Sequence, residues 1–513
     1  MTLLGGCLRN AKKIAIRVDA TSQIGTGHFM RCLTLADELK QHGAEIRFIS
    51  RDLPQHLGEM LKLKGFEFIS LLQSNNVEQL DNLAHSKWLG TSQAEDAQAS
   101  IDALSDKNWD WLIVDHYALD TRWETKLRES AKKIMVIDDI ADRQHNCDLL
   151  LDQNYYADME ARYIGKVPTH CQLLLGPRYA LLRDEFKKWR EQVKPRTGSV
   201  KSILIFFGGV DSDNYTGQTL DALNEINLEN IHIDVVIGAQ HPYRSAIETI
   251  YIKQSYTCHV QTDNMAELMA TADLAIGAGG TATWERCCLG LPTLVFCIAD
   301  NQKAQINDAA TKGLLYAQNH DTKVSSVIKT HLTALINNSC LRHHISNNAL
   351  QEIDPNGKSR LISEMGCSGL TIRKAKEDDS FNLFTWRNHT TIRSVSKNKN
   401  IILWEDHQRW LHNTINSEDK ILLIAKNYNE TIGVIRFDKQ DNQAEVSIYL
   451  VPEKNNKGQG KDLLITAEQW LKTHYPEIKY INAIVLDNNI SSHKLFLKSR
   501  YQLNISHYQK SVN

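Results

Sequence analysis

The sequence lacks any hydrophobic run long enough to cross a membrane. Its longest apolar segments, such as residues 111–114 and 203–207, have the length of buried strands. Residues 1–13 contain no apolar stretch of the kind that a secretory signal peptide requires. These two absences predict a cytoplasmic protein without membrane insertion.

An excess of charge of one sign is also missing, since the formal net charge is −2 over 513 residues. Nothing therefore draws the chain to nucleic acid or to anionic lipid, and we expect neither as a partner. The ten cysteines are scattered without the spacing of a metal site, and the adjacent pair Cys287 and Cys288 suits neither a zinc knuckle nor a disulfide. We expect buried, reduced cysteines and no metal.

The chain is too long for one hydrophobic core, and its length predicts about three domains. Short β-branched runs alternate with helical patterns at residues 14–18, 45–49, 111–114 and 134–137. Residues 188–202, which include Pro195 and Gly198, predict a linker. The alternation then resumes at residues 203–207, 232–237, 274–276 and 293–296. This pattern predicts an α/β fold with two doubly wound Rossmann-like lobes, 12–190 and 200–361, and a ligand between them at the carboxyl ends of the strands.

A second break falls at residues 354–357 and again at 366–369, and the pattern changes beyond it. A helical stretch over 377–388 is followed by three alternating segments typical of antiparallel strands, at residues 421–425, 432–438 and 444–450. We expect a separate α+β domain over 369–513.

The first candidate site follows the first predicted strand. Gly25 and Gly27 precede His28, and a helix is expected over residues 33–40. Glycines in this place let backbone N–H groups approach a phosphate or a sugar at a helix N-terminus. An imidazole at the edge of the expected cleft can remove a proton from water near neutral pH. The glycine turn alone leaves open the alternative of a helix start with a surface histidine.

The second predicted lobe has a matching glycine-rich set. Gly208 and Gly209 end the strand at 203–207, while Gly279 and Gly280 precede a helix that begins near Thr281. Their N–H groups, together with the positive end of that helix, suit a diphosphate.

Two further polar elements accompany these glycines. Glu285 lies one turn inside the helix, where its carboxylate can accept from ribose hydroxyls, although taken alone it is equally a solvated helix carboxylate. Asn301 and Gln302 follow the strand at 293–296 and are candidates for binding the sugar.

The strings RVDATSQIGTGHFMRCLTLADEL, FFGGVDSDN and GAGGTATWERCCLGLPTLVFCIADNQ resemble the UDP-2,4-diacetamido-2,4,6-trideoxy-β-L-altropyranose hydrolases. The resemblance covers residues 12–361 and implies the two-lobed GT-B architecture of MurG-type glycosyltransferases. It implies metal-independent hydrolysis at the anomeric carbon with release of UDP. On this resemblance His28 is the general base, Asp19 and Arg31 shape the sugar pocket, and Glu285 holds the ribose.

The C-terminal domain contains a second glycine turn. Gly458 and Gly460 follow the strand at 444–450 and open a helix over 462–473, which again suits a pyrophosphate. With the motif at residues 489–501, this turn resembles the GNAT superfamily of N-acetyltransferases over residues 370–507. The resemblance implies acetyl-CoA as co-substrate, held by Val451, Lys457, Gly458, Gly460, Lys461 and Asn489.

The domain departs from the GNAT pattern at two positions that matter. Asn455 stands where glutamine or arginine is usual, and Phe496 replaces the tyrosine that commonly protonates the departing CoA thiolate. By sequence proximity, Tyr449 and Tyr501 are the replacement candidates. Residues 386–388 (Trp-Arg-Asn) resemble an element of nucleotide-sugar N-acetyltransferases, and Glu445 is a candidate for positioning a water near the amine.

The sequence thus predicts two successive steps in pseudaminic acid biosynthesis: 4-N-acetylation of a UDP-amino-sugar, then hydrolysis that frees the diacetamido sugar from UDP. Two alternatives remain. One is a GT-B glycosyltransferase with an acetyltransferase tail. The other is a nucleotide-sugar-binding protein whose C-terminal domain is a degenerate acetyltransferase.

Overall fold

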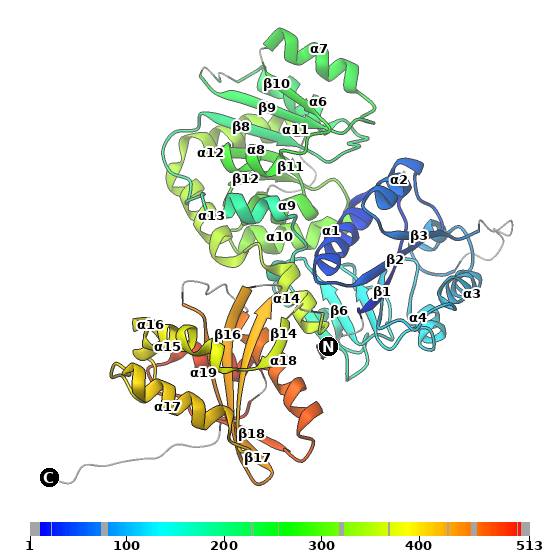
Figure 1. Ribbon diagram of the computed structural model, residues 1–513. Helices are drawn as coiled ribbons and strands as arrows, with labels where there is room; N and C mark the ends of the chain where they lie inside the picture. The colour runs from blue at the N-terminus through cyan, green and yellow to red at the C-terminus, as the bar shows by residue number, and fades with distance from the viewer. Residues whose placement is uncertain are drawn as a thin grey trace. The chain divides into compact units, whose positions relative to one another are not determined.

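The computed structural model describes residues 11–21, 23–72, 81–226, 228, 230–254, 256–317, 323–367, 370–427, 430–452, 459–499 and 501–503. The chain divides into two compact units, Met1–Leu361 and Ile362–Asn513. The first unit contains two sheets and the second contains one (Figure 1). Within the described ranges, no helix combines the length and the apolarity that a membrane span requires.

The first lobe is built on a seven-stranded parallel sheet in the order β3-β2-β1-β4-β5-β6-β7. Its strands are β1 (Lys13–Val18), β2 (Glu45–Ser50), β3 (Glu67–Ser70), β4 (Trp111–Asp115), β5 (Ile134–Ile137), β6 (Leu149–Asp152) and β7 (Gln172–Leu175). Its helices are α1 (Gly27–Gln41), α2 (Gln55–Leu63), α3 (Gln93–Leu104) and α4 (Thr121–Leu127), with 3₁₀ turns η1 (Ser86–Leu89), η2 (Ala161–Tyr163) and η3 (Pro177–Tyr179). The sheet reverses direction of growth between β1 and β4, which is the switch point where doubly wound folds bind ligands.

The second lobe has a six-stranded parallel sheet in the order β10-β9-β8-β11-β12-β13. Its strands are β8 (Ser202–Phe206), β9 (His232–Ile237), β10 (Thr257–Val260), β11 (Leu274–Ala278), β12 (Thr293–Phe296) and β13 (Tyr316–Ala317). Its helices are α6 (Tyr215–Leu223), α7 (Arg244–Gln254), α8 (Met265–Thr271), α9 (Thr281–Cys288), α10 (Lys303–Thr311), α11 (Val324–Val327), α12 (Thr333–Asn337) and α13 (Ser339–Glu352), with η4 (Asp300–Gln302) and the π-helical turn η5 (Ile328–Leu332).

Both faces of this second sheet are buried. Along β8, Leu204 packs into one hydrophobic cluster while Ile203 and Ile205 pack into another on the opposite face. Burial on both faces explains why central strands such as β8 and β12 are apolar runs without polar alternation. The predicted pair of Rossmann-like lobes is confirmed, although the sequence reading missed the short strands β3, β6, β7, β10 and β13.

The two lobes are joined by segments that cross in both directions. Helix α5 (Asp184–Arg190) packs its buried Phe186 into the core of the second lobe, so the chain crosses earlier than the linker expected over 188–202. Helix α14 (Gly357–Glu364) returns to the first lobe, where the Lys358 ammonium lies 3.1 Å from Glu38 on α1. A Cβ at Gly357 would lie 2.2 Å from the carbonyl oxygen of Ala180, so this helix start needs glycine.

The second unit is a five-stranded mixed sheet in the order β14-β15-β16-β17-β18, in which only β17 and β18 pair in parallel. Its strands are β14 (Leu370–Lys374), β15 (Lys420–Asn427), β16 (Glu430–Gln440), β17 (Gln443–Leu450) and β18 (Tyr480–Ala483). Its helices are α15 (Ser380–Asn388), α16 (Thr390–Arg393), α17 (Trp404–Ile415), α18 (Gln459–His474) and α19 (Ile490–Lys498), with η6 (Glu377–Asp379). The predicted separate α+β domain is confirmed.

The two faces of this sheet carry different helices. Ile435 and Phe437 face a core formed with α18 and α19, whereas Leu422, Ile424 and Val434 pack with side chains of α15 and α17. The alternation follows from the two-residue period of a strand.

Candidate functional sites

His28 is not in the glycine turn but in the first turn of α1, because this helix starts at Gly27 and not near Leu33 as expected. Its side chain is 11% exposed. The helix extends toward the turn because no residue between Gly27 and Leu33 interrupts it, and the N–H of Met30 bonds to the carbonyl of Thr26. The imidazole is therefore held by a rigid element, with a small part of its ring accessible.

The first lobe pairs His28 with a buried carboxylate. Nδ1 of His28 lies 2.5 Å from Oδ1 of Asp115, the last residue of β4. Burial raises the pKa of Asp115, but the charge of Arg31 and then of His28 more than offset it, so the pKa lies below its ordinary value. An ionised Asp115 favours the tautomer in which Nδ1 carries the proton and Nε2 has a free lone pair.

Arg31, one turn further along α1, links this pair to the end of β5. Its Nε and Nη2 donate to both oxygens of Asp115 at 2.6 and 2.7 Å, and its Nη1 donates to Asp139 at 2.9 Å. The hydroxyl of Tyr117 donates to the other oxygen of Asp139. Asp115, Tyr117 and Asp139 lie at the carboxyl ends of β4 and β5, and sequence reasoning missed all three.

Aromatic rings surround the histidine. The His28 ring meets Tyr117 edge-on with 4.6 Å between centroids, and Trp88 stacks on Tyr117 at 5.6 Å. His85 completes the group, 4.4 Å from Trp88. Rings around a nearly buried imidazole limit the approach of water, and they offer apolar surface to a deoxygenated part of a ligand.

Asp19 belongs to a separate buried network. Its carboxylate binds Arg17 at 2.5 and 2.9 Å, accepts from Ser50 and from the N–H of Arg51 at 2.8 Å each, and is fully buried. Through these contacts Asp19 fixes the loop after β2 against the end of β1. Its role in shaping the sugar pocket stays a prediction.

In the second lobe, the glycines lie at the carboxyl ends of β8 and β11, as the sequence indicated. Gly208 has φ +106° and Gly280 has φ +107°, values that side chains other than hydrogen disfavour. The backbone at Gly209 touches Gly238, where a Cβ would meet the Gly209 carbonyl oxygen at 2.0 Å. Both loops therefore expose backbone groups rather than side chains.

The structure brings Gln302 to the Gly279–Gly280 loop. A Cβ at Gly279 would lie 3.0 Å from Oε1 of Gln302 and 2.6 Å from Ile306, so α10 packs closely on this loop. Thr281 is the first residue of α9, and Asn301 is exposed within η4. The helix end, the loop and the η4 amides thus lie together.

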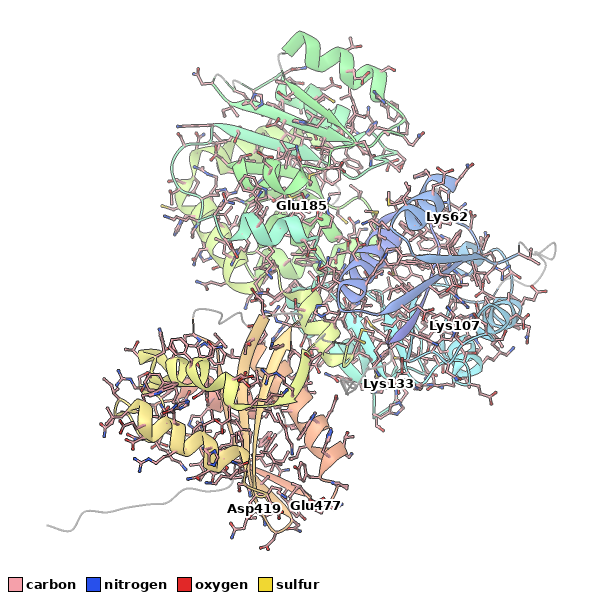
Figure 2. The ribbon with its side chains drawn as sticks, in the orientation of Figure 1. Lys62, Lys107, Lys133, Glu185, Asp419 and Glu477 are labelled. Atoms are coloured by element: carbon pink, nitrogen blue, oxygen red, sulfur yellow. The ribbon has the colours of Figure 1, made fainter. Side chains whose placement is uncertain are left out.

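Glu285 is largely enclosed on α9. Its Oε1 lies 3.3 Å from Nη2 of Arg183. Arg183 also pairs at 2.8 Å with Glu185 of α5, whose position is labelled in Figure 2. Burial raises the pKa of Glu285, while Arg183 opposes the shift. The preceding residue of α9, Trp284, donates from Nε1 to the side chain of Asn154 in the first lobe at 2.9 Å. Trp284 also packs in the core of the second lobe.

In the second unit, the parallel pair β17–β18 separates before β17 ends. Their register runs only from Gln443 opposite Tyr480 to Val446 opposite Ala483. On the β18 side, residues 447–450 of β17 therefore have no strand partner among the described residues. On its other edge β17 stays paired with β16, and the N–H of Val451 donates to the carbonyl of Ile432 at 2.9 Å. A strand edge without a partner can accept the amide groups of an extended ligand.

The expected coenzyme residues that the structure describes lie after β17, on α18 and at the start of α19. Gly460 is in the first turn of α18, and Asn489 caps α19 through Ser492 N–H at 3.1 Å. Lys461 is also on α18, and its ammonium pairs with Glu364. Lys457 and Gly458 lie outside the described residues.

The tyrosine candidates differ in position. Phe496 is 7% exposed and packs in the core against Tyr501, whose hydroxyl donates to Glu468 at 2.8 Å. Tyr449 instead belongs to the unpartnered end of β17. Burial raises the pKa of Tyr449 above its usual value, although Arg387 and Arg436 oppose the shift. Its hydroxyl therefore keeps its proton at neutral pH.

The chain contains a glycosyltransferase-like region followed by a domain of the GNAT type. Residues 202–358 match the glycosyltransferase family 28 C-terminal domain, and residues 384–500 match the acetyltransferase (GNAT) family. Side chains that could form a three-ligand metal group are absent from the described residues.

Three similar proteins extend this comparison. The chain is 26% identical over 303 residues to the UDP-2,4-diacetamido-2,4,6-trideoxy-β-L-altropyranose hydrolase of Campylobacter jejuni, which covers 59% of this chain and 97% of that protein. An uncharacterized protein of Methanocaldococcus jannaschii is 25% identical over 502 residues, 94% of this chain and 95% of its own length. MurG of Acinetobacter baumannii covers 69% of this chain and 99% of its own at 16% identity, with a TM-score of 0.48.

The Campylobacter hydrolase is a homologue of the two-lobed unit, and the GNAT domain is fused behind it. The archaeal relative aligns with both parts of this chain, so the same order of two parts occurs in a second protein.

Proposed function

We propose that residues 12–361 hydrolyse a UDP-linked 2,4-diacetamido-2,4,6-trideoxy sugar to the free sugar and UDP. The observation that carries this proposal is the contact between His28 and Asp115, together with the glycine loops at the carboxyl ends of β8 and β11. The Campylobacter hydrolase named above supplies the substrate class.

In this reaction, Nε2 of His28 takes a proton from a water that attacks the anomeric carbon. The bond between that carbon and the diphosphate oxygen breaks, and UDP leaves with the electron pair. Asp115 stabilises the imidazolium that forms, and a placed base of this kind contributes about 10²–10⁴-fold. The loops at Gly208 and Gly280 provide N–H donors for the diphosphate, so the leaving group needs no added proton.

We further propose that residues 369–513 transfer an acetyl group from acetyl-CoA to the 4-amino group of the precursor UDP-sugar. The open edge at residues 447–450 would pair with the amides of the pantetheine arm, and α18 would face the pyrophosphate. The amine attacks the thioester carbonyl, the carbon–sulfur bond breaks, and Tyr449 gives its proton to the thiolate. The proton that the amine nitrogen loses passes through water and restores the Tyr449 hydroxyl.

Incubation of the purified chain with UDP-amino-sugars, with and without acetyl-CoA, tests both halves by mass spectrometry. We expect an added acetyl group on the UDP-sugar and, separately, UDP release from the diacetamido form without any sugar acceptor. Release of UDP only when a second sugar is present would identify a glycosyltransferase instead.

A further inference from the structure

One face of the GNAT sheet carries a group of arginines that the acetyl-CoA site does not use. Arg387 lies on α15, Arg393 on α16 and Arg436 on β16. Arg436 is directly opposite Ser447 in the pairing of β16 with β17, and Tyr449 is two residues further along β17. Val434, which lies on the same face of β16 as Arg436, packs together with Tyr449 against side chains of α15 and α17. Helices α15, α16 and α17 lie on this side of the sheet (Figure 1).

Arg387 lacks an acidic partner in the described part of the chain. Its Nη2 donates to the carbonyl of Asn398 at 3.1 Å, while its Nη1 is buried and has no hydrogen-bond partner. Burial lowers the pKa of Arg387, and the neighbouring charges of Arg393 and Arg436 lower it further. A half-buried guanidinium beside two others is destabilised unless an anion joins it.

The contacts of the other two arginines do not bring an acidic partner to Arg387. Arg393 donates only to carbonyl oxygens, those of Asn388 at 2.9 Å and Lys399 at 3.0 Å. Arg436 pairs with Asp438 at 2.8 Å, but its Nε is buried without a partner. By contrast, Arg373 in the same unit has a bidentate pair with Asp379 at 2.7 Å on each branch. Among the described residues of the second unit, the buried guanidinium nitrogens without a hydrogen-bond partner are those of Arg387 and Arg436.

We propose that Arg387, Arg393 and Arg436 form an anion site that binds the diphosphate of the nucleotide-sugar acceptor. The proposal deepens the acetyltransferase function proposed above and rests on it for the identity of the acceptor. Guanidinium forks suit phosphate oxygens through paired N–H donors. The site lies on the same strands as Tyr449 and Glu445, so a diphosphate held here places the attached sugar near the thioester end of the coenzyme site.

Acceptor recognition by this site predicts a difference between two amines. The full chain should acetylate a UDP-4-amino-sugar with a much lower KM than the same amino sugar without UDP. Arg387→Met keeps the length of the side chain and removes its charge. We expect it to raise the KM for the UDP-linked acceptor by about tenfold or more, with unchanged kcat/KM for the free amino sugar and unchanged acetyl-CoA affinity.

Arg409→Ala is the matched control, because Arg409 is 76% exposed on α17 and pairs with Asp406 on the surface. It should leave both acceptors unaffected. Equal KM for the UDP-linked acceptor in wild type and Arg387→Met would overturn the site while leaving the acetyltransferase function intact.

Equilibrium titration with UDP separates the site from the reaction. The second unit should bind UDP about tenfold more weakly, or weaker still, in Arg387→Met and with unchanged affinity in Arg409→Ala, while the UDP affinity of the first unit stays the same in both. If the wild type acetylates no UDP-amino-sugar but Arg387→Met still weakens one of the two UDP affinities, the anion site stands and the proposed acceptor is wrong. Equal UDP affinities in wild type and Arg387→Met overturn the anion site.

Discussion

Nδ1 of His28 and Oδ1 of Asp115 lie 2.5 Å apart, although 87 residues separate them in the chain. The contact exists because β1 and β4 are neighbours in the parallel sheet, so the helix after one strand and the carboxyl end of the other meet. It gives the histidine an orientation and a proton location that the sequence alone did not define.

His28→Asn tests the general base. We expect hydrolysis of the diacetamido UDP-sugar to fall by about 10²–10⁴-fold, because asparagine cannot accept a proton from water. UDP affinity, measured by titration, should change little, since the proposed phosphate donors are in the second lobe. Hydrolysis within about tenfold of wild type, a loss of only ~1.4 kcal/mol, would remove His28 from the mechanism.

Asp115→Asn tests the orienting carboxylate. An amide neither stabilises the imidazolium nor favours the Nδ1–H tautomer, so we expect kcat to fall by about 10²-fold or more with unchanged UDP affinity. The matched control is Asp110→Asn at the other end of the same strand, where the carboxylate pairs with Lys132 at 2.9 Å. Equal rates in the two variants would contradict the pairing argument.

Gly280→Ala tests the phosphate loop. The φ of +107° strains any side chain there, by about 1–3 kcal/mol, and a shifted loop should weaken UDP binding. Gly198→Ala serves as control, because Gly198 also has a positive φ, +86°, with open space around its Cβ position. Both variants should unfold at a lower temperature in calorimetry. A UDP affinity in Gly280→Ala equal to that in Gly198→Ala would exclude the loop from binding.

Asp152 predicts a pH dependence of stability. Burial, followed by the charges of Asp139 and Asp138, raises its pKa to about 8, while the side chain accepts from Asn154 N–H at 2.9 Å and from the Tyr163 hydroxyl at 3.0 Å. The folded state holds a proton that the unfolded state releases near pH 4. The protonated Asp152 carboxyl therefore contributes fully to the free energy of unfolding below about pH 4. This contribution is lost progressively as the pH rises to about 8, by at most ~1.4 kcal/mol per pH unit.

Asp152→Asn imitates the protonated carboxyl without titrating. The Tyr163 hydroxyl keeps a second acceptor, the carbonyl of Asp138 at 2.9 Å. We expect urea unfolding of the variant to show a flatter dependence between pH 4 and 8 and greater stability than wild type at pH 8. A slope identical to that of wild type would show that Asp152 is ionised in the folded protein.

The acetyltransferase proton donor is tested by two tyrosine changes. Phe496→Tyr should not raise the acetylation rate by more than about tenfold, because position 496 is in the core. Tyr449→Phe should lower the rate by at least about tenfold. Tyr480→Phe is the control, since Tyr480 is 62% exposed on β18. Restored activity in Phe496→Tyr of an otherwise inactive domain would indicate a decayed enzyme.

Several features followed from the sequence because they depend on local patterns. Apolar runs, the glycines at strand ends and the break near residue 366 predicted two Rossmann-like lobes and a separate α+β domain. The same reasoning could have identified Asp115, because this residue directly follows a predicted strand and so lies at the edge of the sheet where ligands bind. Short strands such as β13, with two residues, left no periodic signal.

What the sequence determined by itself is the set of elements and the placement of polar residues at their ends, since strand and helix periods and glycine conformations are local properties. Only the tertiary structure decided the partners. It enclosed Asp19 among Arg17, Ser50 and Arg51, set Asp115 against His28, and left Arg387 without a carboxylate in the described region. The reason is physical, because side-chain pairing, burial and the resulting pKa shifts depend on which strands become neighbours. The types of two residues far apart in the sequence do not show whether the fold will bring them into contact.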